Sequence, residues 1–182
     1  MAIDCTGSNG NPNDPATFRH AVLPEGPPND YQRAIKGISE IILEFSASNS
    51  IELFGFGGCP CFKTFQGEDV MHCFSLTGDE HNPTVQGLDG VMKAYEAAMK
   101  PDVILMAGPT RFTELIQKSM EIAEAGRKDK KYQVLLILTD GMIDDMDSTI
   151  DLLAKCTKIP LSIIIIGVGE EDFGKMQVLD GD

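Results

Sequence analysis

Three oxygen-bearing side chains follow the first apolar run of the chain at two-residue spacing. Asp4, Thr6 and Ser8 lie in the segment AIDCTGSNGNP, where a short apolar strand gives way to a polar, glycine-rich turn. This spacing places one carboxylate and two hydroxyls on a single loop, aimed at one point. A hard divalent cation prefers oxygen ligands of this kind. The motif therefore predicts a metal-binding loop.

Two later segments can complete the ligand shell. Thr110 lies in GPT, and Asp140 ends the apolar run YQVLLILTDG. In an open α/β sheet, ligands bind outside the carboxyl ends of strands, where the strand order reverses. If the first strand and the strand before Asp140 are neighbours, their loops meet at that point. We therefore expect the three segments to form one site.

Each of these residues also has an ordinary structural explanation. The first loop can be a polar turn whose side chains satisfy their own backbone, Thr110 can cap the next helix, and Asp140 can be a turn residue. The acidic run at Asp144, Asp145 and Asp147 is explained by a solvated loop with favourable charge at a helix N-terminus, or by a second cation site. The coincidence of three oxygen-rich segments favours the metal site.

The elements that must position these residues alternate between strands and helices. Patterns typical of helices cover residues 30–45, 85–99, 112–125 and 148–158, the last opened by a capping box at Ser148 and Asp151. Strands are predicted to end at Asp4 and to cover residues 51–56, 70–76, 134–138 and 161–166, the last two buried on both faces. Residues 9–29 form a long loop and a candidate binding loop. We expect an α/β fold: an open, mostly parallel, doubly wound sheet flanked by helices, with one antiparallel edge strand.

Length and charge narrow the possible partners. The 182 residues fit a single domain, 1–182, whose first residues read as the end of a strand that begins upstream, so we expect a domain excised from a longer protein. The net charge of −13 repels phosphate backbones and anionic lipid headgroups. Nucleic acid and direct docking to an anionic membrane are therefore disfavoured. No apolar segment is long enough to predict a membrane span.

The cysteines favour a reducing, cytosolic setting, because they are five in number and not densely spaced. They are Cys5, Cys59, Cys61, Cys73 and Cys156. Cys59 and Cys61, with His72-Cys73, could form a zinc site, but the spacing matches no common zinc pattern, and free thiols in a hairpin are the favoured interpretation. For all three histidines the default expectation is a surface or hairpin position: His20, His72 and His81.

The motifs resemble a known family. DCTGS, GPT and LILTDG together resemble the metal-ion-dependent adhesion site of von Willebrand factor A domains. More narrowly, AIDCTGSNGNP, GFG, VQGLDGVMKAY, AGPTRF, LLILTDGMIDDM, IPLSIIIIGVG and DFGKMQVLDGD resemble the A domain of copines. This ordered set runs over nearly the whole chain and is more specific than any single motif. Cys5 stands where an aromatic or aliphatic residue is expected, and we expect its side chain to point into the core.

The resemblance implies a metal site with hydroxyl ligands and with carboxylates that bind directly or through water. The implied ligands are Asp4, Thr6, Ser8, Thr110 and Asp140. Two carboxylates roughly neutralise a divalent ion, while neutral hydroxyls leave it electrophilic, so an open sixth position can accept a carboxylate from a partner. Mg²⁺ suits octahedral oxygen ligation, Mn²⁺ also fits, and Ca²⁺ is possible.

The implied function is a metal-dependent protein-interaction module, not an enzyme, that offers its metal face to an Asp or Glu of a cytosolic target. Membrane recruitment of the cytoplasmic full-length protein is then calcium-dependent and comes from lipid-binding domains outside this chain. One alternative is the substrate-recruiting A domain of a RING-type ubiquitin ligase, although no RING cysteines occur here. Another is a metal-dependent phosphatase with Asp4 as nucleophile, but Thr6 stands where its second acid is expected.

Overall fold

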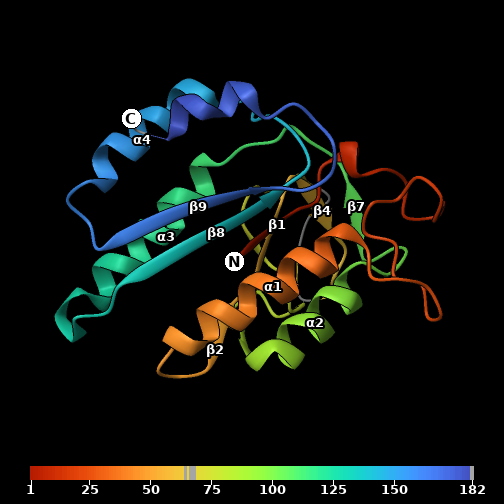
Figure 1. The fold of residues 1–182 in the computed structure, drawn as a ribbon, viewed down its shortest axis with the longest axis horizontal. Coiled ribbons are helices and arrows are strands. Elements are labelled where there is room, and N and C mark those ends of the chain that lie inside the picture. Colours follow the sequence, from red (N-terminus) through yellow and green to blue (C-terminus); the bar gives the residue numbers. More distant parts are fainter. Residues whose placement is uncertain (64, 66–68, 181–182) are drawn as a thin grey trace.

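A sheet of five strands forms the centre of the molecule (Figure 1). The computed structural model describes residues 1–63, 65 and 69–180. The strands of this sheet are β1 (Ala2–Asp4), β3 (Phe54–Phe56), β5 (Phe74–Ser75), β8 (Gln133–Thr139) and β9 (Leu161–Gly167). They are ordered β5-β3-β1-β8-β9, and only the β3–β5 pair is antiparallel. The α/β class is confirmed, and so is the adjacency of β1 and β8 on which the predicted site depends.

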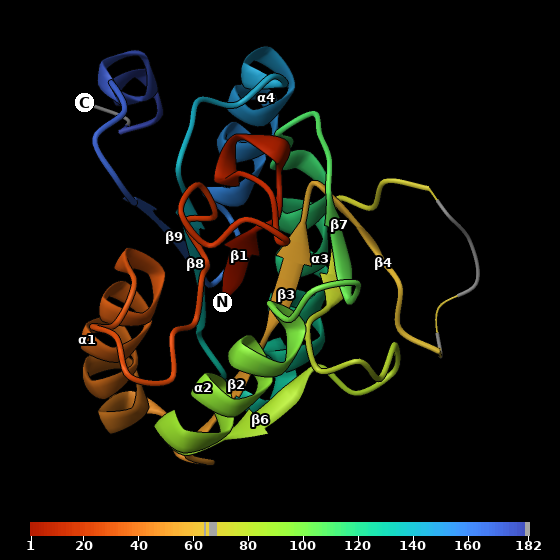
Figure 2. The same cartoon turned by 90° about the vertical axis from the view of Figure 1, so that its right-hand side faces the viewer.

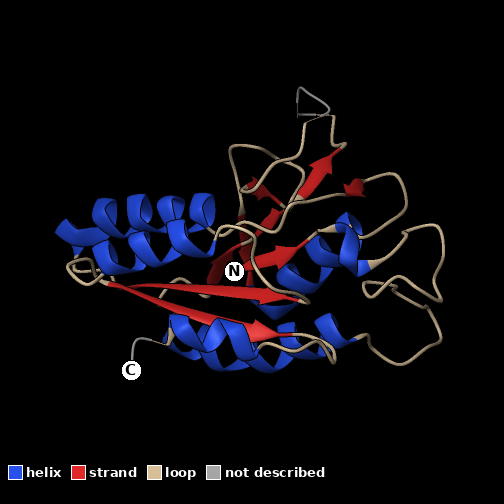
Figure 3. Cartoon of the chain, turned by 90° about the horizontal axis from the view of Figure 1, so that it is seen from above, coloured by secondary structure: helices blue, strands red, loops and turns tan. Residues whose placement is uncertain are grey.

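Helices cover both faces of the sheet (Figure 3). They are α1 (Asp30–Phe45), α2 (Gly87–Ala98), α3 (Thr113–Gly126) and α4 (Met146–Cys156). Side chains alternate across a strand, so Leu136 and Leu138 of β8 join the core beneath α1 and α2, while Leu135 and Ile137 join the core beneath α3 and α4. The sheet is therefore doubly wound, as predicted.

The start of α1 shows how sequence fixes the helix boundary. Asn29 accepts a hydrogen bond from the Gln32 backbone N–H at 2.8 Å, and the Gln32 side chain accepts one from the Asn29 N–H at 3.0 Å. This reciprocal capping box satisfies two donors that would otherwise be unpaired. Tyr31 and Ile35 on the same helix face are wholly buried. Predicted residues 30–45 are confirmed as α1.

Four short strands differ from the prediction. The expected strand 51–56 is split, and its first half, β2 (Ser50–Glu52), pairs antiparallel with β6 (Thr84–Gln86), where the sequence pattern predicts the start of a helix. A second antiparallel pair, β4 (Gly58–Pro60) with β7 (Ile104–Met106), is not predicted by the sequence (Figure 2). Three-residue strands show no usable periodicity, and only pairing partners far away in sequence define them. The structure thus contains more antiparallel strands than the one that was predicted. The predicted edge strand, residues 70–76, is shorter than expected and corresponds to β5.

Two further predictions were wrong. The strand β9 is not buried on both faces, because it lies at the edge of the main sheet and Ile164 is 44% exposed. The last helix begins at Met146, with Asp145 as its N-cap, so Ser148 lies inside the helix. The Thr149 N–H reaches back to the Asp145 carbonyl at 2.9 Å and closes the first turn ahead of the position that Ser148 suggested.

No helix among the described residues combines the length and apolar character needed to cross a bilayer.

Candidate metal centre

Asp4 ends β1 with a wholly buried carboxylate. Its Oδ1 accepts hydrogen bonds from the Thr6 backbone N–H at 2.8 Å and from the Thr6 hydroxyl at 2.5 Å. Its Oδ2 accepts one from the Thr139 hydroxyl at 2.5 Å. Burial raises the pKa of Asp4 to about 6, although the hydrogen bonds from Thr139 and Thr6 oppose that rise. A bound cation would stabilise such a charge.

A chain of hydroxyls connects Asp4 to Asp140. The 3-10 turn Gly7–Asn9 folds the loop back, so that the Thr6 and Ser8 hydroxyls lie 2.9 Å apart. The Ser8 hydroxyl in turn donates to Asp140 Oδ1 at 2.7 Å. Four of the five residues predicted as ligands therefore lie in one row of close oxygen–oxygen contacts, in which each hydroxyl donates its proton to a carboxylate. Ser8 is exposed, so the chain opens to solvent there.

Asn9 and Thr139 belong to the site although neither was predicted. The Asn9 side-chain amide lies 3.3 Å from Oδ1 of both Asp4 and Asp140, and it is wholly buried. Thr139 holds the other oxygen of Asp4. Both residues adjoin the predicted motifs in the sequence, and this adjacency was the only sign that they could belong to the site. They orient the two carboxylates toward each other, while the hydroxyls lie between them.

Asp140 has an unexpected partner in Arg19. Oδ2 of this wholly buried carboxylate accepts no hydrogen bond in the described part of the chain, but it lies 3.2 Å from Arg19 Nε. A second guanidinium nitrogen lies 3.4 Å from Glu171 Oε1. Burial raises the pKa of Asp140, whereas the Ser8 hydrogen bond and the Arg19 charge lower it. Arg19 thus supplies a positive charge to the site from within the long loop 9–29.

Thr110 lies near the chain of hydroxyls but outside it. Its loop is brought alongside by β7, because Thr6 pairs with Ala107 and the Gly7 N–H donates to the Ala107 carbonyl at 2.5 Å. Among the described residues, no hydrogen bond joins Thr110 to the other four. Instead its N–H donates to Asp144 Oδ2 at 2.8 Å. The alternative that Thr110 caps α3 is wrong, since the N-cap is Phe112.

The acidic run fastens the Thr110 loop to the Asp140 loop. Asp144 donates its N–H to the Thr110 carbonyl at 2.7 Å, completing a reciprocal pair. Asp145 accepts from the N–H groups of Phe112 and Thr113 at 3.1 and 3.0 Å, at the N-terminus of α3. The expectation of favourable charge at a helix N-terminus is met by Asp145, and Asp144 is exposed, as expected for a solvated loop, although both acids also hold backbone N–H groups.

His20 is buried beneath the site, which contradicts the expected surface position. Its Nε2 lies 2.8 Å from the Asp4 carbonyl and its Nδ1 2.9 Å from the Tyr95 hydroxyl. A carbonyl only accepts, so Nε2 carries the proton and Nδ1 accepts from Tyr95. Burial lowers the pKa of His20 to about 3, which fits this neutral tautomer. The imidazole holds the backbone of Asp4 in place.

We therefore expect His20 to make the metal-free domain sensitive to acid. The unfolded pKa of 6.5 exceeds the folded value of about 3, so the stability from neutral His20 is present above pH 6.5 and lost as the pH falls. The free energy of unfolding, relative to His20→Gln, should fall by about 1.4 kcal/mol per pH unit below 6.5. Urea unfolding with EDTA measures it. Asp4 contributes equally to wild type and to His20→Gln, so its opposing effect cancels when the two are compared. If the difference in their free energies of unfolding did not change with pH, the prediction would be wrong.

Gly57 leaves room for Thr6. Its φ of +74° is in the left-handed region, and a Cβ there would lie 2.2 Å from Thr6 Cγ2. We expect Gly57→Ala to destabilise the domain by about 2 kcal/mol and to weaken metal binding by displacing Thr6. A Cβ added at Gly37 in α1 would meet nothing within 4 Å, so Gly37→Ala should stabilise by about 0.5–1 kcal/mol. Thermal unfolding measures the stability of both variants, and calorimetric titration measures their affinity for Mg²⁺. If Gly57→Ala and Gly37→Ala changed stability and affinity by equal amounts, the prediction would be wrong.

The residues present fit a hard divalent cation. The atoms that could ligate an ion here are all oxygens. Two of the residues that supply them are buried carboxylates with raised pKa values. Within the described residues, no three side chains of His, Cys, Asp or Glu gather as a metal site, so hydroxyls are needed to complete the shell. The same finding removes support from the zinc alternative at Cys59, Cys61, His72 and Cys73. Cys5, next to Asp4, is wholly buried as expected.

Comparison with known proteins identifies related sequences. A family model described as "Copine" matches residues 19–182. "Protein BONZAI 1" of Arabidopsis thaliana is 40% identical over 184 residues, covering 100% of this chain and 30% of that protein. "Copine-C" of Dictyostelium discoideum and "Nicotinic receptor-associated protein 1" of Caenorhabditis briggsae are each 38% identical over 183 residues, covering 100% of this chain and 32% and 28% of theirs. The chain thus spans about a third of the relatives' length.

Proposed function

Because the chain belongs to the copine family, we propose that it is a metal-dependent protein-interaction domain and not an enzyme. The observation that carries the proposal is the chain of hydroxyls that runs from buried Asp4 to buried Asp140 and opens to solvent at Ser8. None of the three relatives carries an enzyme name. The name of the Caenorhabditis briggsae relative records an association with a receptor, which supports an interaction role.

The proposed ligands are the five residues predicted from sequence. Asp4 and Asp140 balance the charge of Mg²⁺, Mn²⁺ or Ca²⁺, and the hydroxyls of Thr6, Ser8 and Thr110 complete the shell. Thr139 and Asn9 hold the carboxylates in position. When bound, the cation supplies an electrophilic position that a carboxylate oxygen can occupy. Thr110 takes part once its hydroxyl turns toward the Thr6–Ser8 loop, beside which its own loop is fixed.

Electrostatics makes such an interaction depend strongly on metal. The two carboxylates of the centre and the exposed Asp144 and Asp147 beside it repel an acidic segment of a partner when no metal is bound. A cation at the centre gives that segment a carboxylate-binding position on this face. The proposed partner is a cytosolic protein that presents Asp or Glu. The proposal for the whole cytoplasmic protein is that calcium-dependent lipid-binding domains outside this chain bring it to membranes.

A carboxylate probe tests the open position directly. The Mn²⁺-loaded domain is titrated with N-acetylglutamate amide while water-proton relaxation is measured, and N-acetylglutamine amide serves as the matched control. We expect glutamate to lower the relaxation enhancement, because its carboxylate replaces water, and glutamine to leave it unchanged. If the two amides act alike, the centre has no position for a partner carboxylate and the proposed function fails.

A further inference from the structure

A basic cluster lies where β8 and β9 begin, at the end of the sheet opposite the metal centre (Figure 1). Its cations come from residues 126–132 and 155–160: Arg127, Lys128, Lys130, Lys131, Lys155 and Lys158. Asp129 is the only acid in these two segments, although the chain as a whole has a net charge of −13. Four of the cations, Arg127, Lys130, Lys131 and Lys158, line a cavity of about 440 Å³.

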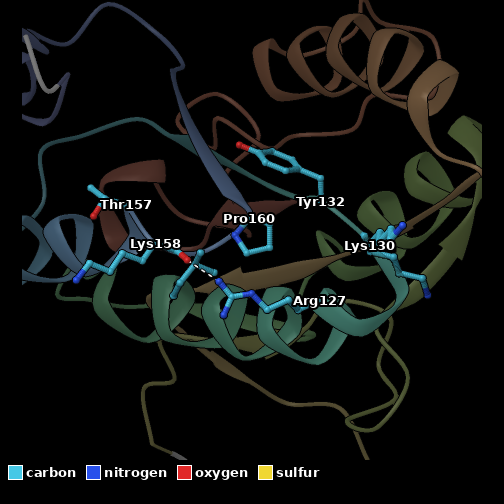
Figure 4. Close-up of a pocket in the computed structure, with 8 residues that line it drawn as sticks. Arg127, Lys130, Tyr132, Thr157, Lys158 and Pro160 are labelled. Carbon is cyan, nitrogen blue, oxygen red and sulfur yellow. Dashed lines mark hydrogen bonds between the residues drawn. The ribbon is translucent and has the colours of Figure 1, made fainter.

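Backbone contacts hold the cavity in shape. The Arg127 guanidinium donates to the Lys158 carbonyl at 2.8 Å and so ties the two segments together (Figure 4). The Lys131 N–H donates to the Gly126 carbonyl at 3.1 Å, and the Gln133 N–H to the Pro160 carbonyl at 2.8 Å. In Figure 4 the Lys130 and Lys158 side chains stand on opposite sides of the cavity, with the Tyr132 ring beside it.

Helix ends do not account for this much positive charge. Both α3 and α4 terminate here, and each helix C-terminus carries roughly half a negative elementary charge. Glu124 is already paired with Arg127 at 3.1 Å. Within the part of the chain that the structure describes, no ion pair engages Lys130, Lys131 or Lys158. These three lysines therefore have no fixed counter-charge among the described residues, and a multivalent anion in the cavity would supply one.

We propose that this cavity binds a compact, multiply phosphorylated group, either a lipid headgroup or a soluble polyphosphate. Three lysines that line one cavity on long, flexible side chains can close on several phosphates of a small ring, which matches them better than carboxylates strung along an extended peptide. The Tyr132 side chain, 63% exposed, adds a flat apolar surface beside them. Ions screen charges beyond about 8 Å at physiological salt, so a ligand in the cavity is governed by the local cations and not by the net charge of the chain. The seven-residue strand β8 separates the cavity from Asp140 by about 20 Å, so this site is independent of the proposed metal function.

The test compares two triple variants with the same change in charge. Inositol hexakisphosphate is titrated calorimetrically, in EDTA, into wild type, into K130Q/K131Q/K158Q and into K36Q/K93Q/K100Q, whose exposed lysines lie elsewhere on the domain. We expect the cavity variant to lose affinity by about tenfold or more and the control variant by less than about threefold. Circular dichroism verifies that both variants are folded. No binding by wild type, or equal losses in both variants, would overturn the proposal.

Two further arms identify the source of the phosphates. Vesicles of phosphatidylcholine with and without phosphatidylinositol bisphosphate are sedimented with wild type and the cavity variant. Binding of the phosphoinositide vesicles that the cavity variant loses assigns a lipid headgroup, whereas calorimetric binding without vesicle binding assigns a soluble polyphosphate. A polyglutamate peptide that binds wild type as tightly as inositol hexakisphosphate, with the same dependence on the three lysines, would overturn the assignment to phosphate.

Discussion

Replacing Asp140 by Asn is expected to abolish saturable binding of Mg²⁺ and Mn²⁺ to the metal-stripped domain. The change removes one of two carboxylates while keeping the shape of a wholly buried side chain. It also removes the charged acceptor of the Ser8 hydroxyl, so the end of the hydroxyl chain is weakened as well. We expect the affinity to fall by at least about 100-fold, because the remaining Asp4 carboxylate balances only half of a divalent charge. Isothermal titration calorimetry measures the loss.

Asp147→Asn is the matched control for this change. Asp147 lies in the same acidic segment, and its exposed side chain has no hydrogen bond within the described residues. Its substitution alters the net charge by the same amount and should change the metal affinity less than about twofold. Metal binding that survives in Asp140→Asn, with a native circular dichroism spectrum, would show that the cation binds elsewhere.

Replacing Arg19 by Gln is expected to raise the affinity for Mg²⁺ by about tenfold. The guanidinium lies 3.2 Å from Asp140 Oδ2 and thereby competes with a cation for that carboxylate. Metal binding must break this ion pair, and a charge-assisted contact of this kind at a partly buried site contributes about 1–2 kcal/mol. The metal-free Arg19→Gln domain should be less stable by a similar amount, because Asp140 loses its nearest positive charge.

Arg111→Gln separates competition at Asp140 from a general effect of charge. Arg111 adjoins Thr110, is exposed and has no ion pair among the described residues. Its loss should raise metal affinity only slightly and leave the stability of the metal-free domain unchanged. If Arg19→Gln lowers the affinity for Mg²⁺ instead, Arg19 supports the metal centre and does not compete with it.

The fold was predictable where a local signal existed. The sequence of α1 contains both a capping residue and apolar residues at helical spacing. The unbroken apolar run of β8 is typical of a central strand. Strands β4 and β7 carry no such signal, since each is three residues long and depends on a partner far away in the sequence. The edge position of β9 was missed for a related reason, because the residues of a strand do not tell how many neighbours it has.

The candidate site was predictable as a set of strand-end motifs but not as a network. Asp4, Thr6, Ser8 and Asp140 meet because β1 and β8 are adjacent parallel strands. The positions of Arg19 and His20 in the site could not be predicted, because both residues lie in an irregular loop whose path follows no periodic pattern. The buried position of His20 depends on Tyr95, a contact between residues 75 positions apart.

Anomalous scattering from crystals grown with Mn²⁺ shows whether the ends of β1 and β8 form a divalent cation site. We predict one strong peak within coordination distance of Asp4, Thr6, Ser8 or Asp140 oxygens, with Arg19 withdrawn from Asp140 and the Thr110 hydroxyl turned toward the ion. A peak elsewhere on the domain, with the Arg19–Asp140 pair intact, would show that the ends of β1 and β8 do not bind the cation.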